Sequence, residues 1–332
     1  MPRRAPSPVP ARAELLAQRG AVAEAYAMLE QAMTAGDAEA TATLAQWRLT
    51  GVHIRRDLAA ARELYGKAGE LGHDDAASHH LALLANGAGG SGRDWHAALQ
   101  RLAARRDPQA RRQHRLIEAM EIDEQGDPAP LSDPIVLHPE PLVERRPGFL
   151  TPEECRYVID LAMPKLEPAV VLHPQTGQPM RDPVRKALGA AFPFVIEDPA
   201  LHAINRRIAA ATGTNYEQGE PLQVLSYNPG DEYKPHSDAI PPSASTNQRI
   251  ATFLVALNAG YDGGETAFPR LGIEWRGQVG EALHFRNVDA AGNPSAAMWH
   301  AGTPVRRGRK FLLSKWLRAA PLDLAGPPGR PF

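Results

Sequence analysis

Cysteine is almost absent from this chain: Cys155 is the only one among 332 residues. A single cysteine excludes an internal disulfide and a zinc site built from several thiolates. No apolar run approaches the ~18 residues needed to cross a bilayer. The first residues are basic but lack the apolar stretch of a secretory signal. We therefore expect a cytoplasmic protein with no membrane partner.

The chain also lacks an excess of either charge. It has 37 Lys and Arg against 38 Asp and Glu, for a formal net charge of -1. Such a balance gives no general attraction to nucleic acid, so no nucleic-acid partner is expected. Hydrophobic residues make up 43% of the chain, which is ordinary for a globular protein. At roughly 100–200 residues per domain, the length indicates two domains.

Composition changes along the chain predict the domain organisation. Proline, arginine and alanine dominate residues 1–12, which we expect to form a disordered tail. Alanine and leucine recur at helical spacing through residues 13–118. Residues 119–146 are rich in proline and lack periodicity, which predicts a linker. A second domain is expected at residues 147–320, followed by a short tail at 321–332, giving an α+β protein.

The first of these domains contains a repeat. The segments DLAAARELY and DWHAALQRL begin at Asp57 and Asp94, whose carboxylates are suited to accept the free N–H groups of a first helical turn. Gly36 and Gly72 fall where helices would end with a positive φ. The period of about 36 residues indicates a helix–turn–helix unit. A plain helical bundle is the alternative.

The stretch TLAQWRLTGVHIRRDLAAARELYGKAGELGHDDAASHHLALL resembles Sel1-like repeats, which are related to tetratricopeptide repeats. This resemblance implies an all-α solenoid in which each helix pair needs its neighbours to bury its apolar side. Solenoids of this kind bind partners on a concave face, so the resemblance also implies a protein partner for this domain.

The sequence of the second domain predicts two helices followed by short strands. FLTPEECRYVIDLAMPKL predicts a helix with Thr151 as N-cap, and Asp198 and Gly213 bound another. The strand-like runs are PLQVLSY, RIATFLVALN, GETAFP, GIEW, EALHFRN, MWHAGTPV and KFLLSKWL. Many short strands separated by turn residues predict a β-sandwich or barrel with helices outside it.

Three residues of this domain form a candidate metal site. His236 and Asp238 are two positions apart, so an extended segment points both side chains to the same side. His300 comes much later and must lie on another strand. Two histidines and one carboxylate make the facial triad that leaves three positions open on a non-haem iron(II) ion. Lys310 follows a turn at Gly308, which would place a cation at the same cavity to hold a carboxylate.

The order of motifs is more specific than the H-x-D pair, which is expected by chance in a chain with 12 histidines. The series LSYNPGDEYKPHSD, RIATFLVALN, GYDGGETAFP, GEALHFRN and HAGTPVRRGRKFLLSKW resembles the catalytic domain of the prolyl 4-hydroxylase family over about residues 147–318. The resemblance implies a double-stranded β-helix, or jelly-roll, fold. It assigns iron(II) to His236, Asp238 and His300, and the distal carboxylate of 2-oxoglutarate to Lys310.

The same resemblance assigns further residues to the cosubstrate pocket. Tyr227 and Thr266 match family positions that line it, and Tyr233 lies close in sequence. The alternative for the tyrosines is a place in the apolar core, and a threonine is common in any strand. Trp299 and Trp316 are expected to be packing residues.

The implied reaction is that of a dioxygenase. 2-Oxoglutarate and O2 would be consumed, succinate and CO2 released, and an unactivated C–H bond hydroxylated, with L-ascorbate keeping the iron reduced. A prolyl residue in a peptide or protein is the expected substrate, and a free amino acid is the alternative. The loop PPSASTNQ (241–248) does not specify which. Two other classes remain open: an adaptor with an inactive dioxygenase-like domain, and a zinc hydrolase with the same ligands.

Overall fold

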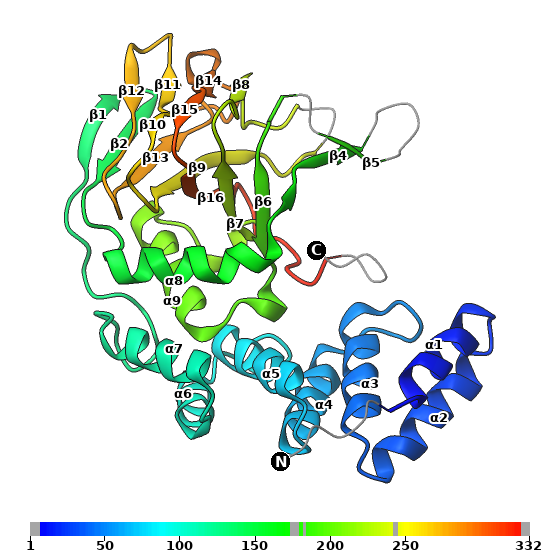
Figure 1. The fold of residues 1–332 in the computed structure, drawn as a ribbon. Coiled ribbons are helices and arrows are strands. Elements are labelled where there is room, and N and C mark those ends of the chain that lie inside the picture. The colour runs from blue at the N-terminus through cyan, green and yellow to red at the C-terminus, as the bar shows by residue number, and fades with distance from the viewer. Residues whose placement is uncertain (1–6, 173–178, 182–183, 242–244, 327–332) are drawn as a thin grey trace. The chain divides into compact units, whose positions relative to one another are not determined.

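The computed structural model describes residues 7–172, 179–181, 184–241 and 245–326 (Figure 1). The chain divides into two compact units. Unit 1 contains Met1–Ala129, Pro193–Arg206 and Asp323–Phe332, and unit 2 contains Pro130–Phe192 and Arg207–Leu322. No helix among the described residues combines the length and apolar character needed to cross a membrane.

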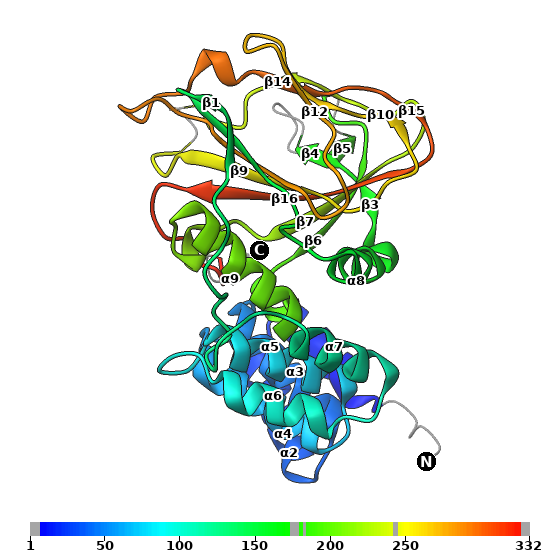
Figure 2. The same ribbon diagram turned by 90° about the vertical axis from the view of Figure 1, so that its left-hand side faces the viewer.

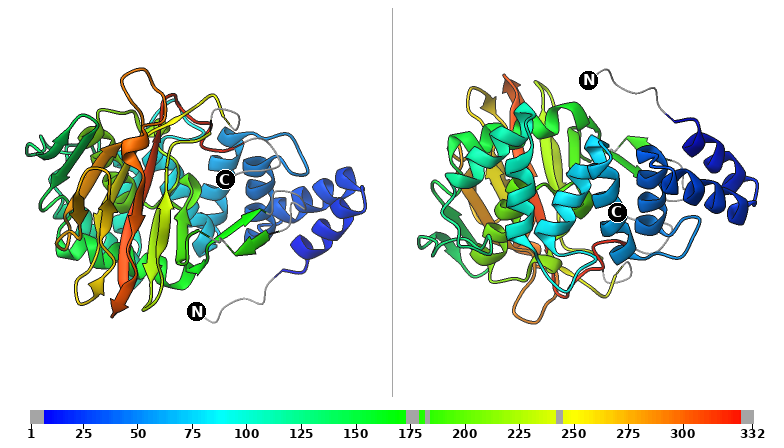
Figure 3. Two further views of the ribbon diagram at one scale, coloured as in Figure 1. Left: turned by 90° about the horizontal axis from the view of Figure 1, so that it is seen from above. Right: turned by 90° about the horizontal axis from the view of Figure 1, so that it is seen from below.

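The first part of unit 1 is helical, as the alanine- and leucine-rich sequence predicts (blue to cyan in Figures 1 and 3). Its helices are α1 (Val9–Gln18), α2 (Val22–Thr34), α3 (Ala38–Thr50), α4 (Leu58–Glu70), α5 (Asp74–Asn86), α6 (Trp95–Ala104) and α7 (Pro108–Glu118). Asp57 and Asp94 are confirmed as N-caps, because their side chains accept the backbone N–H groups of Ala60 and Ala97. The assignment of these helices to Sel1-like repeats stays a prediction.

Unit 1 is completed by segments from the second half of the sequence. Alanine, leucine and tyrosine side chains of α3, α4 and α5 form one apolar cluster. Phe194 and Ala325, which are 7% and 3% exposed, belong to the same cluster, and Val195 and Leu324 pack against it. The Arg56 guanidinium also pairs with the Asp323 carboxylate at 2.8 Å. Part of the surface of α3–α5 is therefore covered by the chain itself.

The structure differs from the sequence-based expectations at three segments. Residues 9–12 are helical rather than part of a tail, because Pro10 lies in the first turn of α1, where proline is tolerated. The expected linker contains two strands, β1 (Ile135–Pro139) and β2 (Leu142–Arg146), whose prolines lie at the end of β1 and in the turn. In the expected tail at 321–332, Leu324 and Ala325 are packed rather than free.

Unit 2 is built on antiparallel sheets. The large sheet has the order β1-β2-β13-β9-β16-β7-β6-β3, and the small sheet has the order β12-β11-β14-β8. The remaining strands of the large sheet are β3 (Glu167–Pro168), β6 (Leu188–Phe192), β7 (Leu222–Tyr227), β9 (Arg249–Ala256), β13 (Ala282–Arg286) and β16 (Lys310–Arg318). The small sheet contains β8 (Tyr233–His236), β11 (Thr266–Phe268), β12 (Ile273–Trp275) and β14 (His300–Gly302). Two strand pairs lie outside these sheets: β4 (Val170–Leu172) with β5 (Pro179–Arg181), and β10 (Asp262–Gly263) with β15 (Val305–Arg307).

The core of unit 2 joins these two sheets. One apolar cluster combines side chains of β7, β9, β13 and β16 with Phe268 and Trp275 of the small sheet. The helix α8 (Pro152–Ala162) lies beside the large sheet in Figure 2 and buries Cys155 completely. Thr151 caps α8 through a capping box with Glu154, as its sequence predicts. All predicted strand-like runs are strands, whereas the finer description as a double-stranded β-helix stays a prediction.

One further α-helix, α9 (Pro199–Thr212), completes the secondary structure of the described residues, together with short 3-10 helices at Met163–Lys165, Phe194–Ile196, Tyr216–Gln218 and Ala296–Met298. The helix α9 begins after Asp198, whose side chain accepts the Leu201 N–H, and Gly213 follows it with a positive φ of 65°. Both ends agree with the sequence. In the loop predicted at 241–248, residues 242–244 lie outside the described residues.

Candidate metal centre and its pocket

Two neighbouring strands of the small sheet bring the histidines of the predicted triad together. His236 ends β8 and His300 begins β14, and the antiparallel pairing of these strands places the two residues opposite each other. Their ring centroids are 4.3 Å apart. Asp238 lies two residues beyond His236, where the chain leaves β8. The register of one strand pair therefore assembles residues that are far apart in the sequence.

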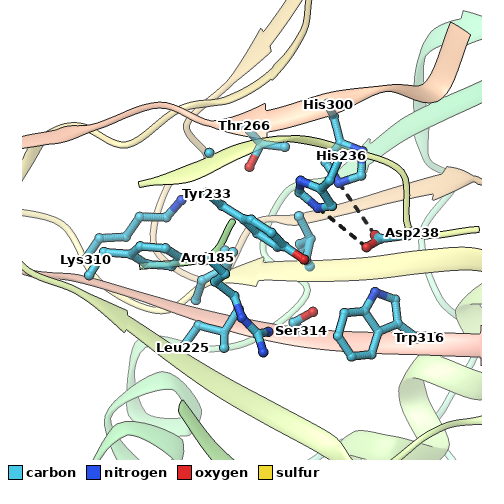
Figure 4. Close-up of a pocket in the computed structure, with 14 residues that line it drawn as sticks. Arg185, Leu225, Tyr233, His236, Asp238, Thr266, His300, Lys310, Ser314 and Trp316 are labelled. Carbon is cyan, nitrogen blue, oxygen red and sulfur yellow. Dashed lines mark ion pairs between the residues drawn. The ribbon is translucent and has the colours of Figure 1, made fainter. Parts of the chain in front are cut away.

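Hydrogen bonds to the backbone orient both imidazoles. The Nδ1 atom of His236 lies 2.8 Å from the carbonyl oxygen of Lys234, and that of His300 lies 2.9 Å from the carbonyl oxygen of Met298. These carbonyls require Nδ1–H donors, which leaves a lone pair on each Nε2 atom. The Nε2 atoms lie 3.6 Å and 3.5 Å from the two Asp238 carboxylate oxygens (Figure 4). One ligand atom from each residue therefore converges within 4.8 Å.

The charge state of the triad suits a divalent cation. Burial acts to raise the pKa of the Asp238 carboxyl, but the charge of His300 and contacts with His236 outweigh it and hold this pKa well below its usual range. Burial lowers the pKa of His300, and the negative charge of Asp238 opposes this shift. A carboxylate that stays anionic, beside the Nε2 atoms of two imidazoles, is a donor set that iron(II) and zinc both accept. The residues present therefore fit the metal that the sequence predicts.

Lys310 supplies a buried cation near this centre. It begins β16, is 3% exposed, and donates a hydrogen bond of 2.6 Å from Nζ to the carbonyl oxygen of Gly264. Its ammonium lies 5.3 Å from the ring centroid of Tyr227, the residue paired with it on β7. Burial lowers the pKa of Lys310 to about 8, although Glu265 opposes this shift. A desolvated ammonium of this kind favours an anionic ligand.

All seven residues singled out in the sequence line one pocket. They are Tyr227, Tyr233, His236, Asp238, Thr266, His300 and Lys310. Because strands of both sheets contribute to this set, the pocket is built from the large and the small sheet together. Figure 4 shows Lys310 toward one end of the pocket and Trp316 toward the other, with the triad above them.

The pocket also contains residues that the sequence did not indicate as functional. Ser314 and Trp316 follow Lys310 at even spacing along β16, so strand periodicity places all three on one face. Trp316 therefore lines the pocket, although it was expected only to pack. Trp299, the other expected packing residue, is 43% exposed. Arg185 also lines the pocket, with its guanidinium 5.6 Å from the ring centroid of Tyr233.

The indole of Trp316 packs against one of a group of three charged residues. The Arg249 guanidinium lies 3.7 Å from the ring centroid of Trp316. It donates two hydrogen bonds, of 2.6 Å and 2.9 Å, to the carboxylate of Glu220. Arg318 donates to the same carboxylate at 2.5 Å. This bidentate arrangement fixes the plane of Arg249 and, through it, the indole wall of the pocket.

The family model and the curated relatives agree on one kind of protein. The family model for the 2OG-Fe(II) oxygenase superfamily matches residues 222–318. "Probable prolyl 4-hydroxylase 10" of Arabidopsis thaliana is 35% identical over 203 residues, which cover 54% of this chain and 69% of that protein. "Prolyl 4-hydroxylase subunit alpha-1" of Rattus norvegicus is 34% identical over 185 residues, covering 54% of this chain and 34% of that one. The crystal structure of the viral collagen prolyl hydroxylase of Paramecium Bursaria Chlorella virus-1 with 2OG has a TM-score of 0.44 and 28% identity, covering 54% of this chain and 96% of that one.

Proposed function

The chain belongs to the prolyl 4-hydroxylase-like family of 2OG-Fe(II) oxygenases, and from this premise we propose that it hydroxylates prolyl residues in a peptide or protein. One observation carries the proposal: the triad of His236, Asp238 and His300 shares a pocket with the buried cation of Lys310. A metal site alone is compatible with several reactions. A metal site with a buried ammonium beside it is suited to a cosubstrate that chelates through one end and carries a carboxylate at the other.

The bound iron(II), 2-oxoglutarate and O2 would supply the oxidising chemistry, in which succinate and CO2 are released. The residues of the chain bind and orient. His236, Asp238 and His300 hold the metal through Nε2 and carboxylate oxygen atoms. Lys310 pairs with the distal carboxylate of 2-oxoglutarate, and Tyr227 and Thr266 line the same pocket. We assign L-ascorbate the role of reductant and the cytoplasm as the compartment.

The walls near the metal are suited to a proline ring. Tyr233 stacks on His236 with ring centroids 3.5 Å apart, and Trp316 closes the pocket on another side. Flat aromatic surfaces bind a compact apolar ring by burying its area without requiring polar partners. Arg185 adds a guanidinium at the pocket, which is suited to donate to a peptide carbonyl oxygen. A free amino acid would bring two more charges, so a peptidyl prolyl group is the better fit.

Replacing Trp316 with alanine tests this substrate. We expect peptide hydroxylation to fall by about 10-fold or more, because the apolar wall for the ring is lost. Peptide-independent succinate release should stay close to wild type, because Trp316 lies away from Lys310 (Figure 4). Proline-containing peptides would be assayed by mass increase, with Trp299→Ala as the control because Trp299 is 43% exposed. Equal loss of both activities, or hydroxylation of free proline in preference to peptides, would contradict the proposal.

The pocket also predicts a pH dependence of 2-oxoglutarate binding. Burial lowers the pKa of Lys310 to about 8, and the cosubstrate binds the protonated ammonium. Affinity should therefore be constant below this pKa and fall by up to about 10-fold per pH unit above it. Calorimetric titrations between pH 7 and 9.5 would measure the decline, and Lys310→Arg should remove it because a guanidinium stays charged. A flat profile in the wild-type protein would contradict the assignment.

For unit 1 we propose a role in binding a protein substrate or partner, as repeat domains of the predicted kind do. The surface available for this is limited, because Phe194 and Ala325 already fill part of the cluster on α3–α5. A partner would have to use the remaining helix surface or displace these segments.

A further inference from the structure

The carboxylate of the metal triad has a partner that the motif does not include. The hydroxyl of Thr252 lies 2.7 Å from Asp238 Oδ2. Both groups are buried, with Thr252 1% and Asp238 6% exposed. The Nε2 atoms of His236 and His300 lie farther from this carboxylate, at 3.6 Å and 3.5 Å. Because rotation about the last torsion of an aspartate is soft, such a bond decides which way the carboxylate faces.

The direction of this hydrogen bond is fixed by a third residue. Asn287, 1% exposed, donates from Nδ2 to the hydroxyl oxygen of Thr252 at 3.0 Å, whereas its Oδ1 atom lies 3.4 Å away. A hydroxyl has one hydrogen, and an ionised carboxylate only accepts. The hydrogen of Thr252 therefore points to Asp238, and its lone pair receives the amide of Asn287. The result is a chain of donors from amide to hydroxyl to carboxylate, in which each bond strengthens the next.

The large sheet holds the two donors of this hydrogen-bond series, Thr252 and Asn287, in place. Thr252 lies on β9, opposite Phe285 of β13, and Asn287 follows β13 by one residue. The backbone N–H of Asn287 donates to the carbonyl oxygen of Ile250 at 2.9 Å, so its position is tied to β9 as well. The histidines of the triad belong to the small sheet. This series of hydrogen bonds therefore anchors Asp238, the third ligand, to the opposite sheet and sets its distance from the imidazoles.

We propose that Thr252 and Asn287 are positioning residues that hold the Asp238 carboxylate between the two Nε2 atoms and so set the affinity of the site for its metal. This inference rests on the proposed function only in taking the triad to be a metal site. Neither residue is among those that line the pocket. Outer hydrogen-bond partners of this type typically account for about 10–100-fold in metal affinity.

Metal titration without 2-oxoglutarate tests the proposal. Thr252→Val keeps the shape of the side chain and removes the hydroxyl, so Co(II) affinity should fall by about 10–100-fold. Thr252→Ser keeps the hydroxyl and should restore wild-type affinity and the visible spectrum of the bound Co(II). Ser226→Ala is the matched control, because Ser226 is equally buried in the same sheet and pairs with Arg309 instead. Wild-type affinity in Thr252→Val would overturn the proposal.

A double-mutant cycle tests the link to Asn287. Asn287→Ala should weaken Co(II) binding in the wild-type background and have no further effect in Thr252→Val, because its influence passes through the hydroxyl. Additive losses of Co(II) affinity would mean that Asn287 does not act through the hydroxyl of Thr252. Should Thr252→Val fail to fold, unchanged Co(II) affinity in Asn287→Ala would overturn the proposal. Wild-type protein that binds no Co(II), or binds it independently of His236, would instead reject the proposed metal centre itself.

Discussion

Succinate release from 2-oxoglutarate is expected to fall by more than about 100-fold when His236 is replaced by alanine. The substitution removes one of three ligands, which is a larger loss than that of an outer hydrogen-bond partner. It also leaves Asp238 and His300 facing each other at 3.5 Å without the third donor. The assay would use purified protein with iron(II), ascorbate and 2-oxoglutarate, first without any peptide and then with proline-containing peptides.

His138→Ala is the control for this experiment. His138 belongs to unit 2 and its ring contacts the carbonyl oxygen of Pro141 in its own hairpin, so its loss should leave turnover intact. Metal analysis of the wild-type protein would separate the iron enzyme from a zinc hydrolase. If the wild-type protein released no succinate and bound no 2-oxoglutarate, the inactive adaptor would become the better description of this chain.

Local signals in the sequence predict the elements of the fold well. Asp57, Asp94 and Thr151 cap helices because their side-chain oxygens need only backbone N–H groups within three residues. The same reasoning fails for β1 and β2, which were assigned to a linker. Prolines in this segment are typical of a loop. The two strands become part of the sheet only because β2 pairs with β13, which is far away in the sequence.

The candidate site also contains both residues that local sequence signals predict and residues that they do not. The spacing of His236 and Asp238 predicts that their side chains converge, and the turn at Gly308 predicts the place of Lys310. Thr252 lies in RIATFLVALN, one of the segments that carry the family resemblance, but its contact with Asp238 is not predicted by spacing. Asn287 was not singled out, because its contact with Thr252 depends on the register of β9 against β13. Residues whose role depends on long-range register are those that a single sequence does not specify.

The second large effect is expected at Lys310. Lys310→Met keeps most of the apolar stem and removes the charge, so a bound dicarboxylate would leave one carboxylate without its buried partner. Breaking a buried ion pair in this way costs about 3–5 kcal/mol, so 2-oxoglutarate affinity should fall by roughly 100-fold or more. Anaerobic calorimetry with a divalent metal present would measure it, while metal affinity itself should change little because Lys310 is not a ligand.

Lys315→Met provides a closely matched control for this prediction. Lys315 lies on the same strand and is 4% exposed, but its ammonium faces the ring of Tyr216 at 5.6 Å and is not part of the pocket. Strand alternation places positions 310 and 315 on opposite faces of the sheet. Loss of 2-oxoglutarate binding in Lys310→Met alone would assign the distal carboxylate to Lys310. Equal affinity in the two variants would mean that the cosubstrate is held elsewhere, since both remove one buried charge from β16.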